Sequence, residues 1–207
     1  MAVVTIGGQS WVVENLDVDT FRDGTSIAHA SSSAQWDSYA KSLTPAWCYY
    51  KFDSSNSRDY GRLYNWYAVS ASQNLAPVGF RLPTLADWTT LINAQGGQLT
   101  AGRPLKNTKF WGSMARINGN GSNASGFTAN PGGYMLQDGE FYDFSWSANF
   151  WSTTTASAGD AYTTRLFWQN AQAINPQANM GMGLSVRILA SGSYTGSSNF
   201  NPSENYG

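Results

Sequence analysis

The chain has 207 residues, which allows one large domain or two small ones with a proper hydrophobic core, so stability does not require disulfides. Its single cysteine, Cys48, excludes an intrachain disulfide and a multi-cysteine zinc site. Only 12% of the residues are charged and the net charge is −1, without a cluster of Lys or Arg, which argues against nucleic acid and against an anionic membrane surface as partners.

The aromatic content is 14%, with nine tryptophans. Rigid rings combined with Ser, Gly and Asn are typical of recognition loops, because such rings give contact area at a low entropic cost. Aromatic side chains also fill cores, and on their usual burial about two thirds of the tryptophans are expected to be structural. No apolar run approaches the roughly 20 residues that span a bilayer, and the first ten residues do not resemble a signal peptide, so the chain as given is expected to be soluble.

The first predicted element is a hairpin. Residues 3–16, VVTIGGQSWVVENL, place β-branched residues on both sides of a Gly7-Gly8 turn. The segment FRDGTSI, at 21–27, and the serines at 31–33 are predicted to be loop. His29 lies between them and is interpreted as a solvated loop residue, because no partner motif lies nearby. Residues 46–52, AWCYYKF, favour a short buried strand.

Two helices are predicted next. Residues 60–71, YGRLYNWYAVSA, carry apolar residues at helical spacing and favour a first helix. A second helix is expected after Pro83, with Thr84 as its cap, Asp87 at the third helical position and the glycines at 96–97 as its end. Its buried stripe is predicted to consist of Leu85, Trp88, Leu91 and Ile92.

The rest of the chain is predicted to hold short strands and loops without another long helix. Residues 149–168 favour two strands around a loop at 158–160, and GLSVRILA, at 183–190, alternates as a last strand. Two helices followed by strands indicate an α+β domain over residues 1–191. Residues 192–207 are too polar to form a core and are expected to be a tail or linker.

Several segments, in this order, resemble the Fibrobacter succinogenes major paralogous domain: TIGGQSWVVENLDV, WCYY, YGRLYNWYAV, PVGFRLPTLADWTTLI, SGFTANPGGY, FWSTT, AY and GLSVR. The resemblance spans roughly Thr5 to Leu189. That family is related to the formylglycine-generating-enzyme branch of the C-type lectin fold. The resemblance therefore implies a C-type-lectin-like α+β fold with two helices, small twisted antiparallel sheets and long loops, exported or displayed on a surface.

One departure from the family concerns its cysteines. Many members carry Cys where this chain has Ala76 and Ile188, so the disulfide framework expected of an exported member is absent. The chain would therefore tolerate folding in a reducing cytoplasm, as a phage structural protein must before lysis.

The same fold serves as the scaffold of receptor-binding proteins diversified by retroelements, on phage tails and bacterial surfaces. Their variable residues lie between an FWS-like strand and the final core strand, and residues 142–182 resemble such a region. The resemblance implies a non-catalytic, adhesin-like domain on a virion tail or cell surface that binds a protein or glycan receptor. Homo-oligomerisation, as a trimer for a tail-tip protein, is left open. The alternative is a carbohydrate-binding or structural module of a secreted surface protein, without hypervariation.

Enzymatic chemistry is not expected. Formylglycine generation needs thiolates that hold copper, and Cys48 alone cannot supply a pair. Glycoside hydrolysis needs two facing carboxylates, but Asp138 and Asp143 beside Gly139 are typical turn residues. The acidic candidates near the proposed site are Asp138, Glu140, Asp143 and Asp160.

Calcium-dependent sugar binding of the lectin type is not expected either. It would want a Glu-Pro-Asn or Gln-Pro-Asp run followed by Trp-Asn-Asp, and the sequence offers only NPQ at 175–177. Calcium prefers several oxygen ligands, commonly carboxylates, and the last third of the chain is poor in them. No cofactor is expected, although a structural calcium near Asp53 or Asp59 is left open.

Recognition by a surface of rings and amides is the remaining function. Rings anchor or stack on a ligand, amides and hydroxyls supply neutral hydrogen bonds, and such a site binds with little salt dependence. Trp151 is assigned to the core. Neighbouring strand residues face opposite sides, so one of Phe167 and Trp168 is expected to be exposed. The predicted contact residues are Tyr142, Phe144, Trp146, Asn149, Tyr162, Thr164, Phe167, Trp168, Asn170 and Asn175.

Overall fold

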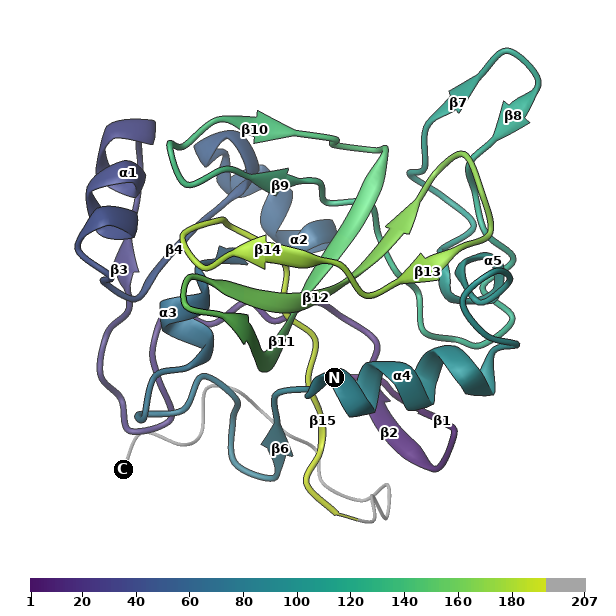
Figure 1. Ribbon diagram of the computed structural model, residues 1–207, viewed down its shortest axis with the longest axis horizontal. Coiled ribbons are helices and arrows are strands. Elements are labelled where there is room, and N and C mark those ends of the chain that lie inside the picture. Colours follow the sequence, from purple (N-terminus) through teal and green to yellow (C-terminus); the bar gives the residue numbers. More distant parts are fainter. Residues whose placement is uncertain (193–207) are drawn as a thin grey trace.

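The computed structural model describes residues 1–192, which combine short helices with small, open sheets in a mixed α+β fold (Figure 1). The α+β class predicted from the sequence is therefore confirmed. The predicted tail, from residue 193 onward, lies outside the described residues.

The predicted N-terminal hairpin is present. β1 (Val3–Ile6) pairs antiparallel with β2 (Gln9–Val12). Gly7 and Gly8 both have positive φ angles, 59° and 78°, as a tight two-residue turn requires. β2 also pairs with β15 (Leu189–Ala190), which pairs with β6 (Phe80–Arg81). One sheet therefore joins the start of the described chain to its end.

The second predicted helix is confirmed as α4 (Leu85–Ala94), which has the predicted cap. The Thr84 hydroxyl accepts a hydrogen bond from the Asp87 backbone N–H, and the Asp87 carboxylate accepts one from the Thr84 backbone N–H, so a full capping box forms. Trp88 is fully buried, as are Leu91 and Ile92, whereas Leu85 is half-buried. The helix ends before Gly96 and Gly97, both at positive φ.

Asp87 has a second function beyond capping. Arg81 donates two hydrogen bonds of 2.6 Å to its carboxylate. Burial alone would raise the pKa of Asp87, but the hydrogen bonds from Arg81 and Thr84 outweigh burial and lower it to about 2. The charged carboxylate therefore ties β6 to the start of α4 at neutral pH.

The first predicted helix is wrong. Its residues form α2 (Ser57–Tyr60), β5 (Leu63–Tyr64) and α3 (Trp66–Val69) instead. Gly61 interrupts the helix because it has φ 65° and packs so closely that a Cβ would lie 2.8 Å from the Leu16 carbonyl. The helical spacing of apolar residues thus arose from separate elements that pack into two core clusters, Leu63 into one and Tyr64 and Ala68 into the other.

A helix also forms at residues 33–41, where the sequence analysis predicted no helix and assigned only the serines at 31–33, as loop. Ser32 caps α1 (Ser33–Lys41) by accepting a hydrogen bond from the Gln35 N–H, and Trp36 anchors the helix in the core. His29 is not a loop residue, since it lies in β3 (Ala28–His29) and its ring stacks on Trp47 at 4.0 Å.

The predicted buried strand at 46–52 is shorter than expected. β4 (Ala46–Cys48) is fully buried, and the chain then turns into the 3-10 helix η1 (Tyr50–Phe52), where Lys51 has a positive φ of 54°. Burial raises the pKa of the Cys48 thiol well above its usual value. Cys48 therefore behaves as a small apolar core residue, as its surroundings in the sequence suggested.

The predicted strand pair around residues 158–160 is confirmed as β11 (Ser147–Ser157) and β12 (Asp160–Phe167). β12 also pairs with two short strands, so it lies at the centre of its sheet, with α4 beneath it in the view (Figure 1). Trp151 is core, as predicted, and donates a hydrogen bond of 2.7 Å to the Tyr64 carbonyl. The two short strands are β13 (Ala173–Ile174) and β14 (Gln177–Asn179).

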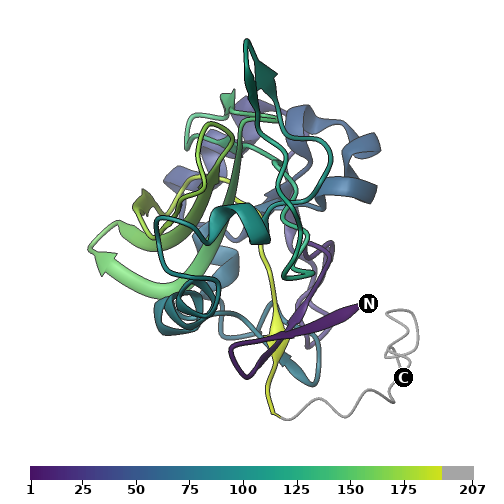
Figure 2. The same cartoon turned by 90° about the vertical axis from the view of Figure 1, so that its right-hand side faces the viewer.

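The remaining elements are short and lie mainly at the periphery. The hairpin formed by β7 and β8 projects from the body in both views (Figures 1 and 2). After α4, the described chain contains one further helix of four residues, which confirms the prediction that no long helix follows. These elements are η2 (Ser54–Asn56), α5 (Gly102–Leu105), β7 (Ser113–Met114), β8 (Ile117–Asn118), β9 (Tyr134–Met135) and β10 (Phe141–Tyr142).

The closing segment does not alternate between core and solvent as predicted. Residues 183–189 are all buried, because core lies on both sides of this segment. Leu184 and Ile188 belong to one apolar cluster and Leu189 to another. Ala76 and Ile188, the two positions at which the resemblance implies Cys in many family members, share one of these clusters and are both buried.

Arg187, in this closing segment, is the most unusual core residue. It is 1% exposed, and it has no ion pair among the described residues. Burial lowers its pKa to about 9, opposed by the charge of Glu14, so the guanidinium stays protonated at neutral pH. Its hydrogen-bond acceptors are the side-chain oxygen of Asn15 at 2.6 Å and the carbonyls of Val12 at 3.1 Å, Phe127 at 2.8 Å and Thr128 at 2.8 Å.

Replacing Arg187 by Met is expected to lower the free energy of unfolding by about 3 to 5 kcal/mol, because several buried acceptors lose their donor at once. Urea denaturation of the variant and the parent chain measures the change. Arg58→Met is the control, since Arg58 is exposed and has no ion pair within residues 1–192. A loss below about 1 kcal/mol for the Arg187 variant would contradict this role.

Candidate binding site

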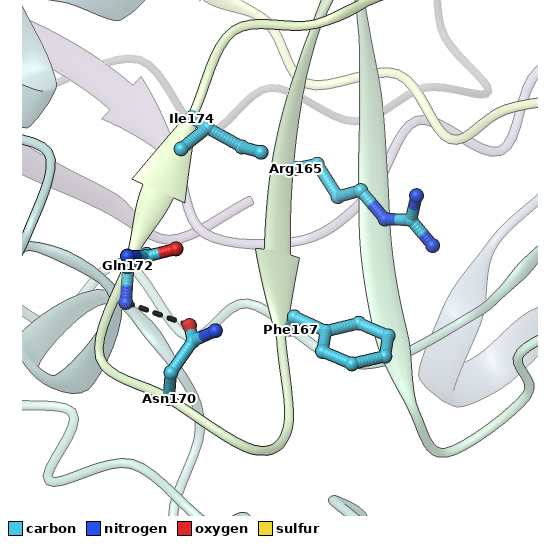
Figure 3. Close-up of a pocket in the computed structure, with 5 residues that line it drawn as sticks. All are labelled: Arg165, Phe167, Asn170, Gln172 and Ile174. Carbon is cyan, nitrogen blue, oxygen red and sulfur yellow. Dashed lines mark hydrogen bonds between the residues drawn. The ribbon is translucent and has the colours of Figure 1, made fainter.

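The candidate site lies on the outer face of β12. Alternation along the strand turns Leu166 into the core and leaves Arg165 and Phe167 partly exposed on the other face. These two side chains and three residues after the strand line a pocket of about 210 Å³ (Figure 3). The lining residues are Arg165, Phe167, Asn170, Gln172 and Ile174.

Strand register brings the two sides of the pocket together. Arg165 of β12 lies opposite Ile174 of β13, which is 39% exposed. Between the strands, the Asn170 side-chain oxygen accepts a hydrogen bond of 2.9 Å from the Gln172 backbone N–H, the dashed line in Figure 3. This Asx-type turn is typical of Asn, and it fixes Asn170 and Gln172 at the rim.

A buried lysine holds this turn from behind. Lys106 is 3% exposed, and its ammonium donates hydrogen bonds to the carbonyls of Phe167 at 3.2 Å and Asn170 at 3.0 Å. Burial, together with the nearby charge of Arg103, lowers the pKa of Lys106 to about 8. At neutral pH the ammonium therefore remains mostly protonated, and it fixes the backbone that forms the pocket.

Helix α5 supports the same turn. The Gly102 N–H donates to the Ala171 carbonyl at 2.8 Å. A Cβ on Gly102 would lie 2.4 Å from the Gln172 carbonyl, so only glycine permits this approach. The Ala173 N–H donates to the Gln98 carbonyl at 2.9 Å. The backbone that forms the pocket is therefore fixed by several hydrogen bonds.

The pocket's one charged group is neutralised. Arg165 forms an ion pair of 2.6 Å with Asp143, and its guanidinium lies 5.3 Å from the centre of the Phe167 ring. Asp143 is thus more than the turn residue predicted from the sequence. Asp138 does have the predicted turn role, since it accepts a hydrogen bond from the Glu140 N–H. The pocket offers an uncharged surface overall.

The ten predicted contact residues separate into three groups. Phe167 and Asn170 line the pocket. Tyr142, 45% exposed, lies on neighbouring β10, where its ring stacks on Tyr134 at 5.8 Å. Arg165 links the two areas, because its guanidinium also lies 5.7 Å from the Tyr134 ring. Phe167, Asn170 and Tyr142 are therefore the predicted residues whose side chains are accessible at or beside the site.

Three predicted contact residues are buried, and this corrects the prediction. Thr164 is 0% exposed, Trp168 5% and Asn149 6%, so they present almost no surface to a ligand. Thr164 faces inward with Leu166, and it donates a hydrogen bond to the Asn175 side chain at 2.8 Å. Of the neighbouring aromatic pair, Phe167 is the accessible one and Trp168 is core.

The four remaining predicted residues are half-buried and have structural contacts. Phe144 packs on Tyr50 at 4.6 Å, and Trp146 meets Trp168 edge-on at 4.7 Å. Tyr162 lies an odd number of residues from Phe167 on β12 and so faces the other side of the sheet. Asn175 accepts the bond from Thr164. None of them lines the pocket.

Three pocket residues were missed by the sequence analysis. Arg165 could have been found, because strand alternation places it on the same face as Phe167. Ile174 could not, since its position depends on the register between β12 and β13. Gln172 lies in a run of amides whose members are indistinguishable without the turn geometry.

No group of three or more His, Cys, Asp or Glu side chains within residues 1–192 is placed to hold a metal ion. Asp53, a calcium candidate, instead accepts a hydrogen bond from the Ser55 N–H at the start of η2. Within the same range, no helix has the length and apolar character needed to cross a bilayer.

The fold and the site define a loop-rich α+β domain that carries a shallow, neutral pocket on its central strand. A scan against protein-family models matches residues 4–189 to the Fibrobacter succinogenes major domain, and the chain belongs to this family. The family resemblance read from the sequence is thereby confirmed. No curated protein and no solved structure matches the chain significantly.

Replacing Lys106 by Met is expected to loosen the pocket turn, because the Phe167 and Asn170 carbonyls lose their donor. Hydrogen exchange of peptides covering residues 167–173 should accelerate at least about tenfold, which corresponds to a local loss of about 1.4 kcal/mol. Exchange in the β1–β2 hairpin should not change.

Lys109→Met is the matched control, because Lys109 is exposed and contacts none of these carbonyls. Equal protection of residues 167–173 in the Lys106 variant and the parent chain would show that the turn does not depend on the ammonium.

Proposed function

We propose that this protein is a non-catalytic ligand-binding domain that recognises a receptor through the outer face of β12 and the turn after it. The observation that carries the proposal is the pocket of about 210 Å³ formed by Arg165, Phe167, Asn170, Gln172 and Ile174. A rigid ring beside adaptable amides is a typical recognition surface.

The accessibility of these side chains supports a binding role. Asn170 and Gln172 are exposed, and the Gln172 amide has no hydrogen bond within residues 1–192. Their backbone, in contrast, is fixed by Lys106 and α5. A preorganised backbone reduces the entropic cost of binding, while free side chains supply the contacts.

The composition of the pocket supports a non-catalytic role. Its five lining residues include no carboxylate, thiol or imidazole that would act as a general acid, base or nucleophile. Asp143, a carboxylate outside the lining, is engaged by Arg165 at 2.6 Å. Cys48 is buried, and its raised pKa keeps it a thiol.

We also propose that the scaffold is C-type-lectin-like and that the pocket segment is diversified by a retroelement. Membership of the family and the position of the pocket between the FWST strand and the closing GLSVR segment support this. Diversified receptor-binding proteins are displayed on phage tails or cell surfaces, and we propose the same location here.

Diversification predicts where sibling gene copies differ. Substitutions should concentrate at accessible positions such as Phe167, Asn170 and Gln172, and should spare the buried Leu166 and Trp168. Sequencing sibling copies tests this. Substitutions spread evenly over the chain would leave a module of fixed specificity, the alternative that the sequence allowed.

A combined protein and glycan array, probed with the purified chain, tests the binding function. The parent chain should bind at least one probe class, and Phe167→Ala should weaken that binding at least about tenfold, because a central ring often dominates an interface. Phe110→Ala is the matched control, since Phe110 is 41% exposed but outside the pocket. Equal loss in both variants, or none in either, would refute the proposed site.

A further inference from the structure

The chemistry of the pocket restricts the ligands that fit it. Resting on the proposed function, we propose that the pocket takes a single neutral N-acetylated hexopyranose unit of a glycan. The Phe167 ring would stack on the apolar face of the sugar, and the amides at the rim would hydrogen-bond its acetamido and hydroxyl groups.

The size of the pocket favours one ring. Its volume is about 210 Å³, below the roughly 300 to 1,000 Å³ of pockets that enclose drug-sized ligands. It is partly open to solvent, and its lining residues come from β12, from β13 and from the turn between them (Figure 3). A terminal or protruding sugar fits such a site, while the remainder of the glycan extends into solvent.

The charge of the pocket favours a neutral ligand. Arg165 is the one ionised lining residue, and Asp143 already compensates it at 2.6 Å. An anionic sugar would have to compete with this carboxylate for the guanidinium, and a cationic ligand would face the guanidinium itself. A neutral ligand leaves the ion pair in place and avoids the cost of desolvating a second charge.

The free hydrogen-bonding groups favour a ligand rich in acceptors. The Asn170 oxygen is occupied by the Gln172 N–H, which leaves the Asn170 NH₂ to donate. Gln172 offers both an NH₂ and an oxygen. The Nε of Arg165 is buried, so the two amides are the groups that we expect to meet a ligand, and an acetamido carbonyl together with ring hydroxyls satisfies their NH₂ donors.

The apolar walls favour the same ligand. Phe167 contributes an aromatic ring to the lining, and Ile174, which pairs with Arg165, contributes an exposed aliphatic side chain. A pyranose has an apolar face of C–H groups for the ring, and the acetamido methyl adds a second apolar group for Ile174. An unsubstituted hexose lacks both that methyl and the carbonyl acceptor, so it should bind more weakly.

Calorimetric titration of the purified chain tests the inference. The probes are N-acetylglucosamine, N-acetylgalactosamine, glucose and N-acetylneuraminic acid. At least one N-acetylhexosamine should bind with a dissociation constant on the order of 1 mM, as expected for a small ligand in an open site. Its affinity should be at least about fivefold that of glucose or of the anionic sugar, and should change less than about twofold between 50 and 500 mM salt.

Gln172→Leu should reduce this affinity at least about fivefold, because it removes two hydrogen-bonding groups at the rim. Gln177→Leu is the matched control, since Gln177 is an exposed amide on β14 outside the pocket. Thermal unfolding of both variants checks that neither loss reflects misfolding.

Several outcomes would overturn the inference. Preference for the anionic sugar, absence of binding by both N-acetylhexosamines, or equal binding by the Gln172 variant would each do so. A protein ligand whose binding depends on Phe167 but is not displaced by N-acetylhexosamines would also overturn it, while leaving the proposed binding function intact. The proposed binding function itself would be refuted if no ligand, protein or glycan, bound the chain in a manner that depends on Phe167.

Discussion

The buried guanidinium of Arg187 is the interaction on which the fold most depends. A charge in a core is costly unless its donors are matched by acceptors. Here the acceptors come from two separate parts of the chain, the end of β2 with the residues after it (Val12 and Asn15) and the loop at Phe127 and Thr128, while the donor, Arg187, lies in the closing segment. The chain cannot satisfy this charge without bringing these parts together, so Arg187 fixes the register of the closing segment against the first sheet.

Lys106, beside the pocket, is a buried charge that is stabilised in the same way. It is a second buried cation whose hydrogen-bond acceptors are backbone carbonyls, those of the turn after β12. Backbone carbonyls thus take the place of carboxylate partners at both sites, in a chain with only 12% charged residues. The backbone of this turn is therefore fixed as part of the fold, whereas the side chains of Asn170 and Gln172 are exposed to solvent or a ligand.

The sequence predicted an element correctly where residues close together in the chain determine that element without help from tertiary contacts. The capping box of Thr84 and Asp87 and the Gly7-Gly8 turn are local signals of this kind, and both elements formed as predicted. The first helix failed because apolar spacing does not reveal a break that depends on tertiary contact, here the close approach of Gly61 to the Leu16 carbonyl. Family resemblance added the correct family but could not place individual side chains.

The site was predictable only as a segment. Family resemblance singled out residues 142–182 and composition supplied the rings and amides within them, yet neither could tell inward from outward positions. Thr164, Trp168 and Asn149 were assigned to the surface although they are core. Alternation from Phe167 would have identified Arg165, whereas Ile174 depends on pairing between strands. The central claim that follows is that one short segment contains two interleaved sets of residues, one that holds the fold and one that is free for recognition.

A saturation substitution scan of residues 162–175, read by protease resistance of the displayed chain, tests this claim most directly. The account predicts that most substitutions at Thr164, Leu166, Trp168 and Ala173 abolish folding, because these side chains are buried. Most substitutions at Phe167, Asn170, Gln172 and Ile174 should leave folding intact, because these side chains are accessible. Equal intolerance of both sets would contradict the account, since the proposed binding face would then be part of the core.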